Sequence, residues 1–343
     1  QPVEEYGRTN YYVAIASLAA SVALLGLNTT VTTFLAKGSN KIGIQANQLV
    51  LISGGIAAII ASLIDWFLGL FVIGMTFWMM SAYELLGKKQ YKQYASVIIG
   101  VRGSQLILAI GLYYLFGIMG IVIGFAISFL LFSYRYFSSI KGFSFNFDEV
   151  KGKMKFSSHA YSFNMSNAFL MYFDKLVIAP LFGYLALGYY QLGFQILLFL
   201  GMIPISFYQY LLSEESSGRT KSKVRIFGFV LSVSLTVAVF LLSPWAIQTF
   251  LPHFISSIDS VRIMSIGIIP MMIVWVLNSR FLSSGSTRSV LIGSAIYVGL
   301  QMFLITQLGS TMGVVGLALA VVTALSAQAA FLYASSRKLG VSL

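Results

Sequence analysis

Long apolar segments follow one another along almost the whole chain, and they constrain the fold more than any other feature. A membrane-spanning helix needs about 20 mostly apolar residues, and eleven segments of the 343-residue sequence satisfy that rule. The predicted spans are residues 11–27, 46–64, 66–83, 95–115, 117–134, 158–181, 185–212, 226–250, 261–279, 289–307 and 312–334. The apolar runs are too long for the alternating ten-residue segments of a strand-based barrel. The sequence therefore predicts an all-α polytopic membrane protein.

The composition supports this fold class and excludes several kinds of function. Only 9% of the residues are charged and 58% are hydrophobic, whereas a soluble domain carries about 25% charge. The absence of cysteine excludes disulfide and thiol chemistry, and two histidines leave little for a metal site. No Gly-rich phosphate loop, HExxH motif or catalytic triad context occurs. We therefore expect no enzyme, no cofactor and no metal.

The basic residues predict how the spans are oriented. We place the joint after the first span in the cytoplasm and let the following joints alternate. Only Arg8 and Arg262, of the 22 Lys and Arg residues, then fall on the outer side. Arg102 and Lys175 lie within spans, and the inner joints hold the rest. The net charge of +12 is thus explained by basic residues in the cytoplasmic joints of a membrane protein, and it does not indicate binding of nucleic acid. We expect a multi-pass protein of the cytoplasmic membrane with its carboxyl end inside.

Two pairs of segments suggest an internal repeat. "YGRTNYYVAIASL" (6–18) aligns with "LGYYQLGFQILLF" (187–199). "GIMGIVIGFAIS" (117–128) aligns with "STMGVVGLALAV" (310–321), which places Gly120 opposite Gly313. Both pairs occur in the same order along the chain. Similar halves are a common mark of transporters.

The repeat predicts two lobes of six spans each. The second half opens with span 158–181, and nothing equivalent precedes Gly7, so the first helix of the first lobe is expected upstream of Gln1. Residues 1–140 form the N-terminal lobe in this interpretation, and residues 141–343 form the C-terminal lobe. The basic inner loop 135–157 is the expected hinge between them.

Charged and amide residues inside the spans are the candidate site. Asn164, Asn167 and Asp174 share one face of span 158–181, which suits a helix that lines a wet cavity. We expect Asp174 and its neighbour Lys175 to point in different directions without pairing, and Lys175 to reach the outer interface. Arg102 is the other cation, open to a role as counter-ion of Asp174 or as a contact for an anionic headgroup.

Structural interpretations stand beside these functional ones. Asp174 can simply lock helix packing near the outer surface, and Arg102 can lie at the inner interface if its span begins later. Arg280 and Arg288 more often determine topology than bind ligands. The basic inner joints suit anionic lipid headgroups, although orientation alone would produce them.

Three segments resemble a known family. They are "EEYGRTNYYVAIASLAASVALLGLNTTVTTFLAKG" (4–38), "MSAYELLGKKQYKQYA" (80–95) and "FDKLVIAPLFGYLALGYYQLGFQIL" (173–197). The chain is similar here to the polysaccharide and O-antigen flippases of the multidrug/oligosaccharidyl-lipid/polysaccharide exporter (MOP) superfamily. The resemblance implies twelve helices in two lobes around a central cavity. It also implies export of a lipid-linked saccharide by alternating access.

Within the resemblance only Asp174 and Lys175 carry over by motif, and Arg102 is inferred from its depth. The expected partners are a lipid-linked saccharide and membrane lipids, and a coupling ion is left open. The alternatives are a cation-coupled multidrug exporter, a membrane-embedded glycosyltransferase or polymerase, and a non-transporting scaffold. A single acidic residue within the spans counts against the exporter, and short outer loops count against the transferase. The sequence names neither the saccharide, nor the lipid carrier, nor the energy source.

Overall fold

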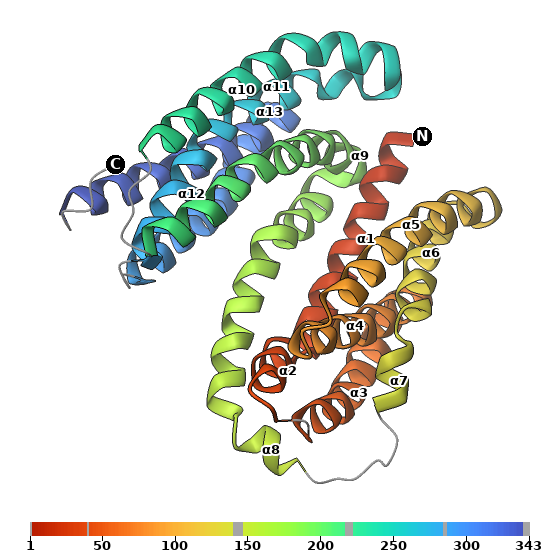
Figure 1. Ribbon diagram of the computed structural model, residues 1–343. Coiled ribbons are helices and arrows are strands. Elements are labelled where there is room, and N and C mark those ends of the chain that lie inside the picture. Colours follow the sequence, from red (N-terminus) through yellow and green to blue (C-terminus); the bar gives the residue numbers. More distant parts are fainter. Residues whose placement is uncertain (1, 40, 140–146, 217–221, 284–286, 339–343) are drawn as a thin grey trace. The chain divides into compact units, whose positions relative to one another are not determined.

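The computed structural model describes residues 2–39, 41–139, 147–216, 222–283 and 287–338, and this part of the chain is built from helices without strands (Figure 1). The helices are α1 (Pro2–Ala23), α2 (Leu27–Ala36), α3 (Lys41–Ser62), α4 (Trp66–Gly87), α5 (Tyr91–Phe116), α6 (Ile118–Leu131), α7 (Tyr134–Ser139), α8 (Asp148–Lys151), α9 (Met154–Ser216), α10 (Ser222–Phe250), the 3-10 helix η1 (Pro252–Ser257), α11 (Ile258–Ile266), α12 (Ile268–Ser283) and α13 (Thr287–Lys338). The predicted all-α membrane fold class is confirmed.

The described helices account for the predicted spans. Seven stretches are long and apolar enough to cross a membrane, and the bent pair α1–α2 makes an eighth. Two of the seven, Met154–Phe207 and Arg288–Arg337, have 54 and 50 residues, more than twice the length that one span needs. Each contains one glycine with non-helical angles, Gly183 or Gly313. Divided there, and with the short apolar α6 added, these helices supply all eleven predicted spans.

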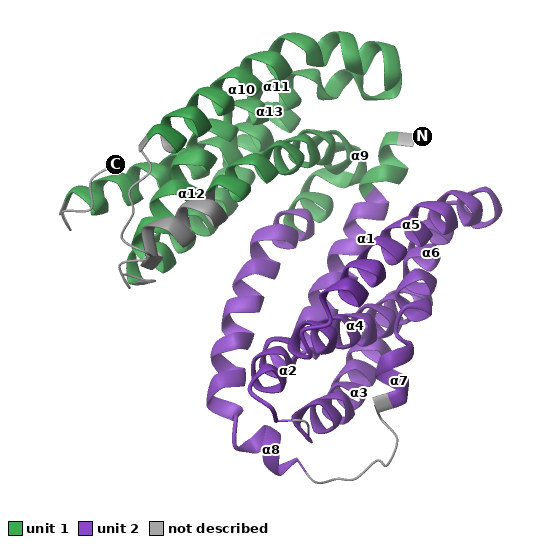
Figure 2. Cartoon of the chain, viewed as in Figure 1, with its two compact units in different colours: residues 1–7, 177–343 green, residues 8–176 purple. Residues whose placement is uncertain are grey.

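The chain divides into two compact units (Figure 2). One unit comprises residues 8–176, and the other comprises residues 1–7 and 177–343. The units change over within α1 and within α9, whereas the sequence places the division at the loop 135–157. Part of that loop, residues 140–146, lies outside the described residues. The two lobes 1–140 and 141–343 stay a prediction about topology.

In the 8–176 unit, α4 is the central helix. Its residues Phe67, Phe71 and Met80 are at most 1% exposed and contribute to two buried clusters. One cluster includes Tyr12 and Ala16 of α1 with Val122 and Phe129 of α6, and the other includes Val31, Ile42 and Val50. By contrast, only 17% of the most apolar part of α5 is buried. Within the described 8–176 unit, much of the surface of α5 is therefore left uncovered by the other helices.

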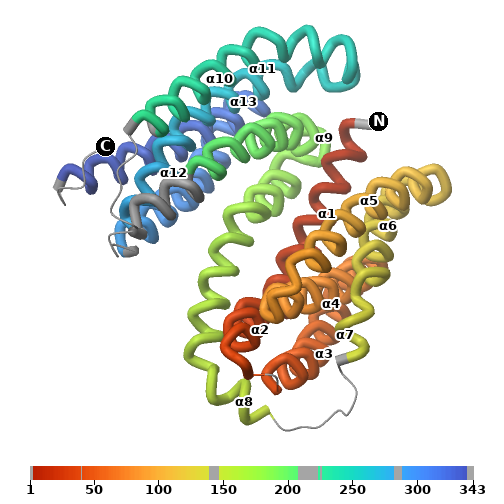
Figure 3. The backbone as a smooth tube through the Cα atoms, viewed as in Figure 1, coloured from red at the N-terminus to blue at the C-terminus, as the bar shows by residue number. Residues whose placement is uncertain are grey.

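Two tight helical hairpins have the same joint. Gly117 joins α5 to α6 with φ 59° and ψ −138°, and Gly313 divides α13 with φ 58° and ψ −135°. A side chain would be strained at these positive φ values, so glycine permits the chain to reverse within one residue. A Cβ at Gly120 would overlap the Leu112 carbonyl, and one at Gly316 would overlap that of Leu308. The tube in Figure 3 shows α5 turning directly back into α6.

This geometry corrects the register of the predicted repeat. The sequence alignment places Gly120 opposite Gly313, but the equal angles and contacts make Gly117 equivalent to Gly313 and Gly120 equivalent to Gly316. The shared pattern is G-I-M-G against G-V-V-G. The sequence alignment was shifted by three residues because it matched the Met-Gly pair of each segment. The residues that truly correspond are the glycines with positive φ at which the chain reverses, Gly117 and Gly313.

The other aligned glycines, Gly7 and Gly188, pack against each other's helices. A Cβ at Gly7 would overlap the carbonyl oxygen of Tyr184, and a Cβ at Gly188 would overlap that of Val3. Gly7 thus meets the carbonyl of Tyr184, which lies four residues before Gly188. Gly188 in turn meets the carbonyl of Val3, which lies four residues before Gly7. A reciprocal contact of this kind is expected where two equivalent helices cross at a pseudo-two-fold axis. It supports the predicted alignment of residues 6–18 with residues 187–199.

Candidate functional site

Asp174 and Lys175 form a salt bridge inside α9. The Lys175 Nζ lies 3.0 Å from the Asp174 Oδ1 and also donates to the Met171 carbonyl at 2.7 Å. The Lys175 backbone N–H donates to the same Asp174 oxygen at 2.9 Å. The residues are 1% and 4% exposed, so both charges are buried.

Two expectations about this pair were therefore wrong. Adjacent Cβ atoms on a helix do point about 100° apart, but the long lysine side chain folds back over its own helix and reaches the aspartate. Lys175 also does not extend to an interface. A buried ammonium that bonds a carboxylate and a carbonyl avoids the free-energy cost of an unpaired buried charge. For Lys175 these two bonds are more favourable than extending the side chain to reach water.

Asn164 lies beside a break in the first span. Its Nδ2 donates to Asn28 Oδ1 and to Thr29 Oγ1, both at 3.1 Å. Asn28 and Thr29 open α2, which is bent from α1 by 50°. The hydroxyls of Thr30 and Ser157 are also 2.9 Å apart. Asn28, Thr29, Thr30, Ser157 and Asn164 make up a set that we call the break cluster.

The break itself has a local cause. Leu25 and Gly26 have φ 51° and 72°, so the α1 hydrogen-bond ladder stops before them. The Ser53 hydroxyl donates at 2.6 Å to the carbonyl of Ala23, the last residue of α1. A Cβ at Gly26 would come within 2.5 Å of the Ser157 carbonyl oxygen, so α9 passes directly against this glycine. The sequence analysis placed a continuous span at 11–27 and missed the break, although Gly26, followed after Leu27 by the three polar residues Asn28–Thr30, is a recognisable signal.

The other predicted residues lie apart from the Asp174–Lys175 pair. Asn167 is exposed although it is seven residues from the buried Asp174, so the face that they share is not uniformly buried. Arg102 is exposed on α5, and its Nη1 donates at 3.0 Å to Oε1 of the buried Gln105. It is not the counter-ion of Asp174, because Lys175 takes that place. Since α5 runs from Tyr91 to Phe116, Arg102 is close to the middle of the helix.

Sequence analysis also missed a buried acidic residue in α4. Glu84 is 6% exposed, and Lys88 Nζ lies 2.5 Å from its Oε1. Its other oxygen, Oε2, has no hydrogen-bond partner among the described residues. In the part of the chain that the structure describes, the helices thus hold two buried carboxylates, Glu84 and Asp174, where the sequence analysis counted one. The signal was present in "MSAYELLGKK", where glutamate precedes lysine by four residues on an apolar helix.

A tyrosine ties α7 to α3 and α4 in the 8–176 unit. The hydroxyl of the buried Tyr136 in α7 donates at 2.7 Å to the Asn47 carbonyl, and its ring stacks on Phe77. Burial raises the pKa of Tyr136 far above its ordinary value, so the hydroxyl stays protonated and remains a donor. Tyr136 therefore has a structural role. No cluster of His, Cys, Asp or Glu suited to a metal occurs in the described ranges.

Solved structures with the same fold are known, although no protein-family model and no curated protein sequence matches the chain. The lipid II flippase MurJ in an inward closed conformation aligns with a TM-score of 0.75 and 16% identity, over 97% of this chain and 81% of that one. The chain has the fold of the MOP-superfamily transporters.

Two further structures share the MOP fold. An inward-facing multidrug resistance MATE family transporter of the MOP superfamily aligns with a TM-score of 0.73 and 14% identity, over 99% of this chain and 91% of that one. A MOP superfamily transporter from Pyrococcus furiosus aligns with a TM-score of 0.58 and 12% identity, over 95% and 85%. Both are transporters, and at 12–14% identity what they share with this chain is the fold.

Proposed function

We propose that the chain is a transporter that moves a lipid-linked oligosaccharide or polysaccharide precursor across the cytoplasmic membrane by alternating access. Asp174, Lys175, Asn164, Asn167 and Arg102 are its proposed cavity residues. The observation that carries the proposal is an exposed arginine at mid-length in an apolar helix of a MOP fold. Charges at that depth are costly in lipid, and they normally mark a substrate or ion pathway.

The proposed roles follow from the environments of the residues. Arg102 presents a planar guanidinium, which suits a phosphate oxygen of an anionic headgroup. Asn167 is exposed and offers an amide to saccharide hydroxyls. The Asp174–Lys175 pair is buried and neutral as a pair, so it supports the cavity wall. Asn164 ties α9 to the first turn of α2, which positions the polar face of α9 on which Asn167 lies.

The second candidate function is a cation-coupled exporter of small amphiphiles. Glu84 favours it, since it is a second buried carboxylate: Lys88 meets its Oε1, its Oε2 has no partner among the described residues, and acidic groups within spans often mark ion pathways. The sequence argument against coupling rested on a single acidic residue. The resemblance to the saccharide flippases in residues 4–38 and 173–197 still favours the first candidate.

The test is reconstitution of the purified chain in vesicles with a fluorescent lipid-linked oligosaccharide. Translocation is followed by protection of the label from an external reducing agent. Wild type, Asp174→Asn and Arg102→Ala are compared with Asp259→Asn, which makes the same chemical change at an exposed carboxylate in α11. We expect translocation by wild type and by Asp259→Asn, and a loss in the other two variants.

Each outcome has a defined meaning. Translocation that is equal in all four proteins would keep the transporter and discard the proposed residues. No translocation of the lipid-linked sugar, together with efflux of a small cationic dye driven by a proton or Na⁺ gradient, would replace the first candidate by the second. In that case Glu84→Gln should abolish the dependence on the gradient.

A further inference from the structure

Methionines of α11 and α12 pack onto glycines of the neighbouring helices α9 and α10 in the 177–343 unit. The distances from an added Cβ to the methionine atoms are 2.8 Å from Gly193 to Met264 Sδ, 2.7 Å from Gly201 to Met271 Sδ, and 2.3 Å from Gly228 to Met272 Cε. Each glycine thus has the end of a methionine where its own side chain would be. We call these three contacts the methionine seam.

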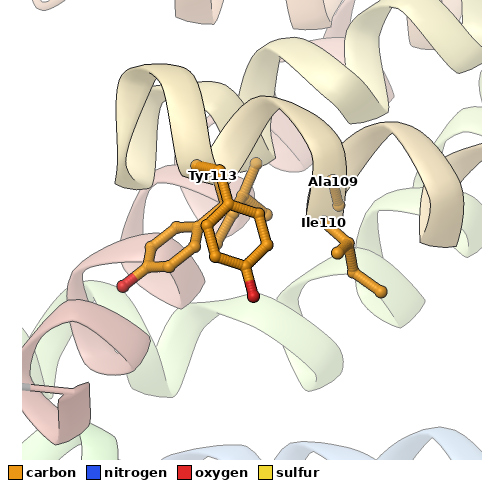
Figure 4. Close-up of a pocket in the computed structure, with 5 residues that line it drawn as sticks. Ala109, Ile110 and Tyr113 are labelled. Atoms are coloured by element: carbon orange, nitrogen blue, oxygen red, sulfur yellow. The ribbon is translucent and has the colours of Figure 1, made fainter.

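The glycine contacts of the α5–α6 hairpin are of a different kind. A Cβ at Gly124 would meet the backbone of Leu108 and Ala109, and a backbone contact cannot give way. A groove of about 300 Å³ stays open beside it, and Figure 4 shows Ala109, Ile110 and Tyr113 along this groove. At the seam, the unbranched methionine side chain has three rotatable bonds and can follow the surface of the facing helix. The seam is therefore an adaptable contact, whereas the hairpin is a fixed one.

The helix that carries the methionines is interrupted between them. α11 and α12 lie in one apolar stretch, yet the helix breaks at Gly267. Pro270 has no N–H to offer to the Ile266 carbonyl four residues before it. The Thr236 hydroxyl of α10 donates at 3.1 Å to the neighbouring carbonyl of Ser265. One seam methionine lies before the break and two lie after it, and a bond to α10 holds the end of α11.

The corresponding helix pair in the other unit differs in both respects. The predicted repeat pairs Tyr12 of α1 with Gly193 of α9. Tyr12 packs its ring edge-on against Phe67 of α4, with ring centroids 5.2 Å apart, whereas Gly193 meets Met264. α4 also runs without interruption for 22 residues. The pair is thus continuous and aromatic in one unit, and interrupted and adaptable in the other.

We propose that α12 bends relative to α11 at residues 267–270, and that the methionine seam keeps α12 in contact with α9 and α10 as it shifts. Such a movement needs a point where the backbone can bend and contacts that adapt when it does. The Thr236 bond fixes α11, so α12 is the moving part, whereas α4 stays rigid. The proposal rests on the proposed function, since the shift changes the shape of the 177–343 unit during a transport cycle.

The test is NMR relaxation dispersion of the methionine methyl groups, which detects exchange between conformations on the μs–ms timescale. The full chain carries ¹³C at the methionine Cε atoms and is studied in detergent micelles. Signals are assigned by single Met→Leu substitutions. Met80 is the internal control, because it is a fully buried methionine of α4. Pro270→Ala supplies an N–H at the break, and the matched control Pro244→Ala makes the same change within α10.

We expect exchange at Met271 and Met272 and a flat profile at Met80. Pro270→Ala adds a backbone hydrogen bond across the break, so the population of the minor conformation should fall about two- to tenfold. Pro244→Ala should leave that population unchanged. Flat profiles at both seam methionines of the wild type would overturn the proposal, and so would profiles that Pro270→Ala leaves as they were.

This outcome is separable from that of the transport assay. Exchange that Pro270→Ala suppresses, without translocation of any substrate, would keep the bend and refute the transporter. Translocation with flat profiles would keep the transporter and refute the bend. A folding failure of Pro270→Ala is recognised by loss of the monodisperse peak in size-exclusion chromatography. In that event Gly267→Ala provides the comparison, because alanine accepts the φ of −60° at that position and narrows the backbone freedom of the break.

Discussion

Lys175 and Arg102 both lie within predicted spans, and their surroundings are opposite. Lys175 is 4% exposed, and its Nζ meets a carboxylate and a backbone carbonyl of its own helix. Arg102 is exposed, and in the described part of the chain one hydrogen bond to the neutral amide of Gln105 is recorded for it. The first charge is neutralised within α9, whereas the second retains its full charge at the surface of α5.

The difference separates a structural charge from one that is available to a ligand. A buried ion pair is costly to break, although its replacement by apolar residues is often neutral. An exposed guanidinium with most of its five donors available can bind an anion without breaking anything inside the protein. The comparison therefore predicts large stability effects at the pair and large binding effects at Arg102.

The largest expected effect comes from Asp174→Asn. This change leaves the buried Lys175 ammonium without its counter-charge, and we expect a loss of about 3–5 kcal/mol in the free energy of unfolding. The measurement is a denaturant titration in mixed micelles followed by circular dichroism. Asp259→Asn, at an exposed position, should stay within about 0.5 kcal/mol of wild type. An Asp174→Asn protein as stable as wild type would show that the negative charge of Asp174 does not contribute to the free energy of unfolding.

The double variant Asp174→Asn with Lys175→Met sharpens that result. Removing both charges removes the unpaired ammonium, so most of the lost stability should return. The same titration measures it, and translocation is assayed in parallel. Recovered stability without recovered transport would assign the pair a role beyond packing. A double variant as unstable as the single one would mean that Asp174 acts through its other contacts.

A smaller effect is expected at Arg102, and on binding instead of stability. Arg102→Gln should change the free energy of unfolding by less than about 0.5 kcal/mol, since the side chain is exposed. It should weaken the binding of polyprenyl phosphate about tenfold. Arg102→Lys keeps the charge but not the planar fork, so an intermediate affinity is expected. Binding is measured by fluorescence anisotropy of a labelled lipid. A strong loss of stability in Arg102→Gln would assign the residue to packing.

The smallest expected effect is that of Gln105→Leu. The buried leucine fills a similar volume, while Arg102 loses the amide oxygen that orients it. A neutral hydrogen bond contributes about 0.5–1.5 kcal/mol, so affinity for the lipid phosphate should fall roughly two- to tenfold. Combined with Arg102→Gln, the substitution should have no further effect on affinity. An additive loss would show that Gln105 contacts the ligand independently.

Much of the fold was predictable because its signals are local. A run of about 20 apolar residues predicts a spanning helix wherever it occurs, and all eleven predicted spans have helical counterparts. The Gly-rich joints near Gly117 and Gly313 were recognisable as tight turns, because glycine alone readily tolerates a φ near 58° together with a ψ near −135°. The prolines were less informative. Pro180 and Pro204 lie within α9, where the one residue with non-helical angles is Gly183.

The candidate site was only partly predictable. The sequence by itself determined which charges enter the membrane, since Asp174, Lys175 and Arg102 interrupt apolar runs whatever their neighbours. Tertiary structure alone decided which charge is paired, which is exposed, and what packs against the break in the first span. The Asp174–Lys175 bond depends on a side-chain conformation, and the break cluster depends on Asn28 and Asn164, which are 136 residues apart. A linear pattern carries periodicity and hydropathy, but partners distant in sequence and side-chain conformations are set only when the helices pack.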